Sequence, residues 1–177
     1  MHTDTVRHAS FTIAPFEPAL RDRIASLVVG IQREEFGIPI SAADQPDLLD
    51  VPGHFQCGKG GFWCATSGER VVGTVGLLDA GEGLGVLRKM FVAPDFRGRD
   101  LGTAQRLFDT AMEWAASHGF STVMLGTVDR LRAAIRFYER NGFVEVSPEQ
   151  LPPHFPRMAV DDRFFRREIA RGAPTDR

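Results

Sequence analysis

Cysteine and lysine are both scarce in this chain of 177 residues, and each scarcity narrows what the protein can be. The two cysteines, Cys57 and Cys64, fit a reducing compartment better than a disulfide-rich secreted domain. Together with His54 they match no standard zinc spacing and lack an evident fourth ligand, so we expect no metal site. Lys59 and Lys89 are the only lysines among 21 basic residues, and this arginine bias is typical of a GC-rich, bacterial genome.

The chain also lacks a strong net charge and long apolar runs. Its formal net charge is −2, so no overall field attracts nucleic acid or an anionic membrane, and we expect neither as a partner. The apolar runs are far shorter than the roughly 20 residues of a membrane span. Residues 1–15 lack the apolar core of a signal peptide, so we expect a cytoplasmic protein.

What is present is an ordinary globular composition, with 43% hydrophobic residues and enough length for a real core. Periodicity predicts one α/β domain over residues 1–170, with a mixed sheet and a frayed tail at 171–177. We expect helices at 18–36, 101–115 and 131–140, with a helical turn near Leu48. The expected strands cover 10–13, 62–66, 71–78, 86–92, 122–127, 143–146 and a last segment around 158–165.

The most informative stretch is residues 87–108, where a strand is followed by a tight loop and a helix. The loop reads Arg97-Gly98-Arg99-Asp100-Leu101-Gly102 and leads straight into apolar residues at helical spacing. Unpaired backbone N–H groups and the positive end of the helix dipole then point into one concavity. The stretch predicts a site for a phosphate or pyrophosphate, although a surface turn with solvated arginines fits it equally well.

A second motif follows about thirty residues after the loop, and with both in view the chain resembles the GNAT acetyltransferase superfamily. That family's phosphate loop has the form Gln/Arg-x-x-Gly-x-Gly/Ala. Arg97 matches its first position and Gly102 its last, whereas Asp100 stands where Gly is usual. The second motif is an Ala, an aromatic-Tyr pair and a Gly-Phe, matched here by Ala134, Phe137, Tyr138, Gly142 and Phe143.

The resemblance implies an α+β fold with a mostly antiparallel, twisted sheet of about seven strands flanked by helices. It implies acetyl-CoA as co-substrate and no metal. The loop amides hold the pyrophosphate in relatives, and the bulged strand before the loop presents amides to the pantetheine arm and the thioester. The implied cofactor-binding residues are Met90, Phe91, Val92, Arg97, Gly98, Arg99, Asp100, Leu101, Gly102, Thr103, Ala134 and Phe137.

Tyr138 is the only tyrosine, and the resemblance implies that it protonates the departing sulfur. A phenol stays protonated at neutral pH and so is a suitable donor to a thiolate. A packing role for Tyr138 is the alternative. The general base is less defined, because residues 86–89 contain no acid where many relatives carry a Glu. Glu82 is the candidate base, and the alternatives are Asp79, Glu34, Glu35 and His54.

The acceptor site is expected in the acidic region from Glu34 to Asp50, whose charge would favour a small-molecule amine. Glu34, Phe36, Phe55 and Trp63 are its candidate residues, although each fits a structural role as well. The predicted activity is transfer of an acetyl group to a primary amine, such as an amino acid, by direct attack in a ternary complex. The alternative is a non-catalytic acyl-CoA sensor or interaction module. Edge strands in this fold often pair between subunits, so a homodimer is also an expectation.

Overall fold

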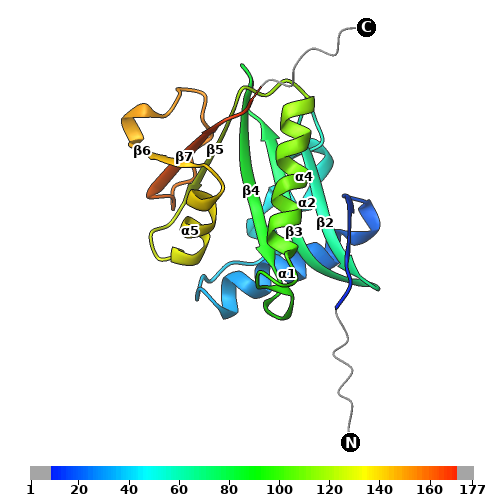
Figure 1. Ribbon diagram of the computed structural model, residues 1–177. Helices are drawn as coiled ribbons and strands as arrows, with labels where there is room; N and C mark the ends of the chain where they lie inside the picture. Colours follow the sequence, from blue (N-terminus) through cyan, green and yellow to red (C-terminus); the bar gives the residue numbers. More distant parts are fainter. Residues whose placement is uncertain (1–8, 171–177) are drawn as a thin grey trace, which may run out of the picture.

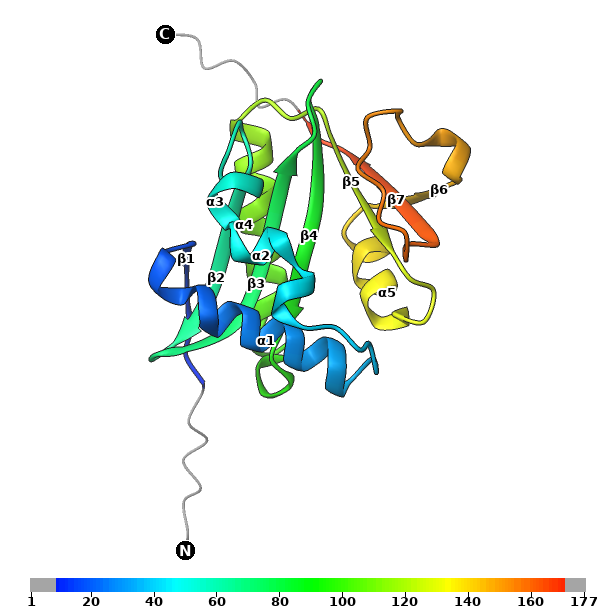
Figure 2. The same cartoon turned by 180° about the vertical axis from the view of Figure 1, so that it is seen from behind.

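The computed structural model describes residues 9–170, which form a twisted seven-stranded sheet with helices on both faces (Figures 1 and 2). The strand order is β1-β2-β3-β4-β5-β7-β6. Neighbouring strands are antiparallel except β4 and β5, which run parallel. The strands are β1 (Thr12–Pro15), β2 (Gly61–Ser67), β3 (Arg70–Asp79), β4 (Leu84–Val92), β5 (Thr122–Thr127), β6 (Val144–Val146) and β7 (Arg163–Glu168).

The longer helices lie on opposite faces of the sheet. One face of β2, β3 and β4 is covered by α4 (Thr103–Ser117), and the other by α1 (Arg21–Glu34) with the short α2 (Pro46–Leu49) and α3 (Val51–His54) (Figures 1 and 2). Beside α4 lies α5 (Arg132–Arg140), joined to it where Gln105 Nε2 donates to Asn141 Oδ1 at 2.8 Å. Short 3₁₀ turns occupy Pro18–Leu20, Ala42–Asp44, Pro94–Phe96 and Pro148–Gln150.

Apolar spacing explains which helix faces are buried. Ile24, Val28 and Ile31 recur every three or four residues along α1 and are all buried. The buried stripe of α4 consists of Leu107, Phe108, Ala111, Met112 and Ala115. This stripe packs closely on β3, because a Cβ on Gly73 would lie only 2.7 Å from Leu107 Cδ1. The central strands therefore carry the core between two helical layers.

The predicted mixed, mostly antiparallel sheet is confirmed, and each predicted helix and each of the first six strands overlaps an observed element. The last strand, predicted around 158–165, also overlaps an observed strand at 163–165, but its predicted start is wrong because β7 begins at Arg163. The preceding residues turn instead, with Asp161 N donating to Met158 O at 3.2 Å and Asp162 N to Thr127 O at 3.0 Å. The predicted frayed tail lies outside the described residues.

The parallel pair β4 and β5 separates partway along its length. The two strands are paired only where Leu84, Gly85 and Val86 face Thr122, Val123 and Met124. Beyond Val86 the strands diverge, while β4 remains paired with β3 as far as Val92. The backbone groups of residues 87–92 that face β5 consequently have no strand partner among the described residues, and the sheet opens into two halves there.

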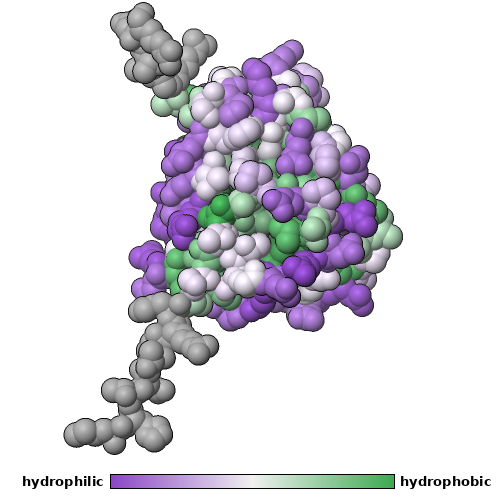
Figure 3. Space-filling view, turned by 90° about the vertical axis from the view of Figure 1, so that its right-hand side faces the viewer, coloured by the Kyte–Doolittle hydropathy of each residue, from purple (hydrophilic) through white to green (hydrophobic). Residues whose placement is uncertain are grey.

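The outer surface is mixed in polarity on the face that Figure 3 presents. Apolar residues appear there as small patches separated by hydrophilic ones. Among the described residues, the large apolar side chains with the greatest exposure are Val144 at 69% and Val160 at 71%. None of the helices among residues 9–170 is long and apolar enough to cross a membrane.

Candidate active site

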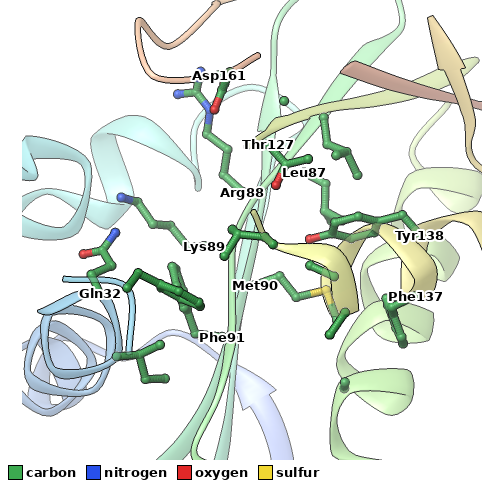
Figure 4. A pocket seen from close by; sticks show the side chains of 18 of the residues that line it. Gln32, Leu87, Arg88, Lys89, Met90, Phe91, Thr127, Phe137, Tyr138 and Asp161 are labelled. Carbon is green, nitrogen blue, oxygen red and sulfur yellow. The ribbon is translucent and has the colours of Figure 1, made fainter. Parts of the chain in front are cut away.

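A cavity of about 670 Å³ occupies the opening between β4 and β5. Its walls come from α1, β4, the end of β5, the α5 segment and the loop that precedes β7 (Figure 4). Met90 extends towards Phe137 on one side of β4, whereas Lys89 and Phe91 extend towards α1 on the other (Figure 4). The cavity is therefore lined by side chains from both sides of β4.

A β-bulge in β4 forms part of the cavity wall. Thr74 pairs with Phe91 and Gly76 with Arg88, so Lys89 and Met90 together oppose the single residue Val75. Lys89 has a φ of 53°, in the left-handed region that non-glycine residues rarely adopt. Its carbonyl accepts a 2.6 Å hydrogen bond from the buried hydroxyl of Thr74. The bulge is thus held by a specific contact from β3.

The loop before α4 has the geometry of an anion site. Gly98 and Gly102 have φ values of 106° and 65°, a backbone conformation that residues with a side chain rarely adopt. Gly102 N donates to Gly98 O at 3.1 Å, and Arg106 N donates to Gly102 O at 2.9 Å. The amides of the first helical turn point out of the helix N-terminus, as such amides do. The Thr103 hydroxyl is buried there and has no hydrogen-bond partner among the described residues.

The Arg97 side chain is already engaged within the protein. Its Nε donates to Val92 O at 2.8 Å, and its two terminal nitrogens donate to the two carboxylate oxygens of Glu35 at 2.6 and 2.7 Å. This bidentate pair holds the loop against the end of α1 and keeps the pKa of Glu35 below its ordinary value. Arg97 lines the cavity but is fixed by Glu35.

Tyr138 lies on α5 with its hydroxyl directed towards β4 (Figure 4). Its ring packs edge-on against Phe137 and Phe143, and its backbone carbonyl accepts a bond from Phe143 N at 3.1 Å. Burial raises the pKa of the phenol to about 12. Tyr138 is therefore a rigidly placed, fully protonated donor at neutral pH.

Four charged side chains gather at the other end of the cavity, and one of them, Asp47, lies in the acidic region where the acceptor site was predicted. They are Asp47, Arg88, Lys89 and Asp161, which come from α2, β4 and the loop before β7. Lys89 Nζ lies 2.7 Å from Gln45 Oε1 and 3.3 Å from Asp47 Oδ2. The adjacent cations Arg88 and Lys89 interrupt an otherwise apolar strand, and that was the available sequence signal.

Sequence comparison decides the family. The chain matches the acetyltransferase (GNAT) family model over residues 27–143. It belongs to the GNAT family. The match covers both motifs and the whole β4–α4 unit that forms the cavity wall.

Several curated relatives of this GNAT protein are vertebrate proteins. The probable N-acetyltransferase camello of Xenopus tropicalis is 37% identical over 110 residues, which are 60% of this chain and 49% of that protein. N-acetyltransferase 8B of Rattus norvegicus is 32% identical over 123 residues, 67% of this chain and 53% of that protein. The chain spans about half the length of the curated relatives it matches.

Solved structures extend the likeness to the whole fold. A GNAT-family acetyltransferase from Staphylococcus aureus Mu50 has a TM-score of 0.85 and 31% identity, covering 91% of this chain and 100% of that one. N-acetylglutamate synthase from Neisseria gonorrhoeae, solved with coenzyme A and N-acetyl-glutamate, has a TM-score of 0.69 and 16% identity over 92% of this chain and 36% of that one. The second likeness shows the shared fold alone.

Because the relatives include vertebrate and bacterial proteins, a bacterial source stays a prediction. The cytoplasmic location and the homodimer also stay predictions.

The structure brings only some of the predicted site residues of this GNAT protein to the cavity. Tyr138 lines it with one acceptor candidate, Phe36. The predicted cofactor residues that line it are Met90, Phe91, Val92, Arg97, Ala134 and Phe137. The remaining cofactor residues, Gly98, Arg99, Asp100, Leu101, Gly102 and Thr103, form the adjoining loop and helix N-terminus.

The other candidates lie outside the residues that line the cavity. The Glu82 side chain is 82% exposed and lies 3.7 Å from His154 Nδ1, on the turn between β3 and β4. Glu34 is exposed, whereas Phe55 and Trp63 are buried in the core. Two further base candidates have local roles: Asp79 accepts from Lys59 N and Gly81 N at 2.9 Å, and His54 contacts Asp50 O at 2.9 Å. The carboxylates that line the cavity are Glu35, Asp47 and Asp161.

Proposed function

We propose that this protein transfers an acetyl group from acetyl-CoA to a primary amine by direct attack. The observation that carries the proposal is the position of Tyr138. Tyr138 is half-buried, and its protonated hydroxyl faces the bulged strand β4 across the opening between β4 and β5. An acid opposite unpaired strand amides is the arrangement that thioester aminolysis needs.

Two features of the chain fit coenzyme A. The positive-φ glycines at 98 and 102 shape a loop whose amides and buried Thr103 hydroxyl suit a pyrophosphate. The β5-facing backbone groups of residues 87–92 lack a strand partner among residues 9–170, and they suit the amide-bearing pantetheine arm. When bound, acetyl-CoA supplies the activated acetyl group. The protein orients this acetyl group and the acceptor amine.

The protein groups act on charge and protons. Amides at the bulge of β4 stabilise the negative charge that develops on the thioester oxygen. The Tyr138 hydroxyl donates its proton to the sulfur as the carbon–sulfur bond breaks. Because its pKa is about 12, Tyr138 does not ionise in the working range and needs no preceding proton transfer. The acceptor amine enters from the end where Asp47 and Asp161 lie, and these carboxylates replace Glu82 as candidates for receiving the amine proton.

A thiol-release assay tests the proposal. Incubation with acetyl-CoA and a panel of amines should release free thiol, and Tyr138→Phe should lower kcat at least about tenfold with nearly unchanged acetyl-CoA affinity. Arg136→Gln, an exposed change on the same helix, is the matched control and should retain activity. Equal turnover by Tyr138→Phe and wild type would overturn the acid role. Tight acetyl-CoA binding without thiol release for any amine would favour the sensor alternative.

A further inference from the structure

The acceptor end of the cavity contains one close ion pair, and it also contains two charged groups, Arg88 and Asp161, that form no salt bridge within 4.0 Å among residues 9–170. Lys89 and Asp47 form the close pair, with side chains only 12% and 15% exposed. Gln45 completes it, because its Oε1 accepts from Lys89 and its Nε2 donates to Gln32 Oε1 at 2.9 Å. This network ties α1 and α2 to the bulge and leaves little capacity for a ligand.

Arg88 is the first of these two groups. Its guanidinium extends towards Asp161 (Figure 4), and its Nη2 donates a hydrogen bond to the carbonyl oxygen of Pro156. Among residues 9–170 no carboxylate lies within 4.0 Å of it. An arginine has five N–H donors, so several remain for a ligand. Burial lowers the pKa of Arg88, and this loss of hydration favours a direct anionic partner.

Asp161 is the second group. Its carboxylate packs against the end of β5, because a Cβ on Gly126 would lie 2.3 Å from Asp161 Oδ2. In the described part of the chain it too forms no ion pair within 4.0 Å. Burial raises the pKa of Asp161 above its ordinary value, and the nearby charge of Arg88 opposes this. A half-buried carboxylate of this kind is suited to receive the proton of an amine.

We propose that the acceptor is an α-amino acid, whose carboxylate binds Arg88 and whose amine lies beside Asp161. The proposal rests on the acetyltransferase function proposed above and names its substrate class. The Arg88 guanidinium extends towards Asp161 and both residues line the cavity (Figure 4), so a ligand that binds both must carry its anion and its amine close together. An α-amino acid places the two groups on one carbon. A planar guanidinium and a carboxylate also match in a bidentate geometry.

The residues around Arg88 and Asp161 favour an acceptor amino acid with an apolar side chain. Phe155, Met158 and Val160 line the same end of the cavity from the loop between β6 and β7. Met158 is 45% exposed and Val160 is 71% exposed. Covering them with an apolar ligand group would remove that surface from water. The proposed acceptor is therefore an apolar α-amino acid such as phenylalanine.

The proposed transfer balances through named groups. The ammonium of the acceptor gives one proton to Asp161, and its nitrogen then forms a bond to the acetyl carbon. The carbon–sulfur bond breaks, and the sulfur takes the proton of Tyr138. The second proton leaving the nitrogen restores Tyr138, and Asp161 returns its proton to solvent. The products are the N-acetyl amino acid, the free thiol of coenzyme A and one proton.

Three matched acceptors test the need for the carboxylate: phenylalanine, phenylalaninamide and phenethylamine. All three carry the same ring and a primary amine, and only phenylalanine carries the negative charge. We expect kcat/KM for phenylalanine to exceed that for the other two by at least about tenfold, the discrimination expected of one charged hydrogen-bonded pair. Equal or faster turnover of phenylalaninamide or phenethylamine would overturn the inference and leave the proposed function intact. Absence of thiol release with every amine would instead contradict the proposed function.

Variants of Arg88 and Asp161 assign the recognition to these residues. Arg88→Gln should reduce the preference for phenylalanine over phenethylamine at least about tenfold, and Arg88→Lys should restore part of it because the charge remains without the planar fork. Arg166→Gln, an exposed change on β7 outside the cavity lining, is the matched control and should keep the preference. An unchanged preference in Arg88→Gln, with the protein folded by circular dichroism, would overturn the assignment.

Asp161 is tested by the pH profile. Wild-type kcat/KM should fall on the acid side as Asp161 becomes protonated, and Asp161→Asn should lower the rate and remove this limb. Gly126→Ala should imitate Asp161→Asn, because its Cβ would lie only 2.3 Å from Asp161 Oδ2 and would displace the carboxylate. Retention of the acid limb in Asp161→Asn would show that the carboxylate does not act on the amine.

Discussion

At the scale of single residues, Lys89 combines a costly backbone conformation with a buried charge. A left-handed conformation costs a residue with a side chain roughly 1 to 2 kcal/mol. The Thr74 hydroxyl holds the Lys89 carbonyl, and Gln45 and Asp47 hold its ammonium group. Contacts to both the backbone carbonyl and the side chain of Lys89 thus hold the bulge in β4. Such local strain is typical of functional sites, because the surrounding contacts must maintain it.

Thr74→Val should weaken this bulge. The change removes the hydroxyl donor and leaves the Lys89 carbonyl short of a partner, so we expect a loss of about 1 to 3 kcal/mol in the free energy of unfolding. It should also lower kcat more than it changes acetyl-CoA affinity, since the amides beside the thioester lose their fixed geometry. Urea unfolding and thiol-release kinetics measure both effects.

Thr122→Val is the matched control for this experiment. It removes a buried threonine hydroxyl from β5, where the partner is the exposed carboxylate of Glu168 at 3.2 Å. We expect normal kcat in this control. If Thr74→Val loses stability but keeps wild-type kcat, the Thr74 hydroxyl is structural and the bulge does not depend on it during catalysis.

Asp100 is the one loop residue whose charge opposes an anionic ligand. It is exposed, and its φ is not among the positive values, so nothing in the backbone requires glycine at this position. Asp100→Gly should therefore tighten acetyl-CoA binding by about 0.5 kcal/mol, roughly twofold, in line with a single exposed charge. Asp100→Asn should give the same gain, and both gains should shrink at high salt. Titration calorimetry at two salt concentrations measures this. Weaker binding in either variant would assign Asp100 a structural role.

The sequence predicted Tyr138 and the glycine loop because each depends on local chemistry within a recognisable motif. It included Asp47 in the expected acceptor region but did not predict Arg88 and Asp161 beside it, because the three residues are far apart in the chain and only the fold brings them together. The acidic region from Glu34 to Asp50 suggested a site for a cation. Most of its acids are exposed, and the cavity itself contains Arg88 and Lys89 beside the carboxylates.

At the scale of elements, the Arg97–Glu35 pair connects the phosphate loop to the end of α1. Arg97 holds the pKa of Glu35 below its ordinary value of 4.5, so the charged carboxylate is favoured in the folded state. The stability that this pair contributes is therefore fully present above pH 4.5 and is lost as the pH falls through the lowered pKa. The Arg97 side chain is 42% exposed and the Glu35 side chain 29%, so solvent screening keeps this contribution small.

Glu35→Gln should lower the free energy of unfolding at neutral pH by less than about 1 kcal/mol. The difference from wild type should disappear well below pH 4.5, where the wild-type carboxyl is also neutral. Urea unfolding across the acid range measures it. Glu34→Gln is the matched control, since Glu34 is exposed and lies outside the cavity lining. A difference between Glu35→Gln and wild type that persists unchanged into acid would show that the ion pair is not its cause.

The misplaced last strand has a physical cause at the same scale. Residues 158–165 read as a strand because Met158, Val160, Phe164 and Phe165 are apolar. Only Phe164 and Phe165 are buried, while Met158 and Val160 lie in the loop at the cavity mouth. Apolar character alone does not distinguish a core strand from an apolar wall of a binding site. The difference arises from the turn that Asp161 makes with Met158.

At the scale of the whole molecule, the sheet consists of two halves that meet at three residue pairs of β4 and β5. Core contacts join the halves further, since Phe108 on α4 packs against Phe137 and Phe143. No local pattern in the sequence reveals where a parallel pair separates, because the pairing involves two segments that are far apart in the chain. The opening is therefore a property of the assembled fold, and a ligand bound there contacts both halves.

Acetyl-CoA should stabilise both halves at once. At a concentration one hundred times its Kd, ligand linkage adds about 2.7 kcal/mol, which for a chain of this size raises Tm by roughly 5 to 10 °C. Hydrogen exchange should slow in residues 87–92 of β4, whose β5-facing amides lack a strand partner in the described structure, and in residues 98–106 around the helix N-terminus. The nucleotide fragment 3′-phospho-ADP lacks the pantetheine arm, and it should slow exchange at 98–106 alone. If both ligands protect β4 equally, or if neither does, then the opening between β4 and β5 is not the pantetheine site.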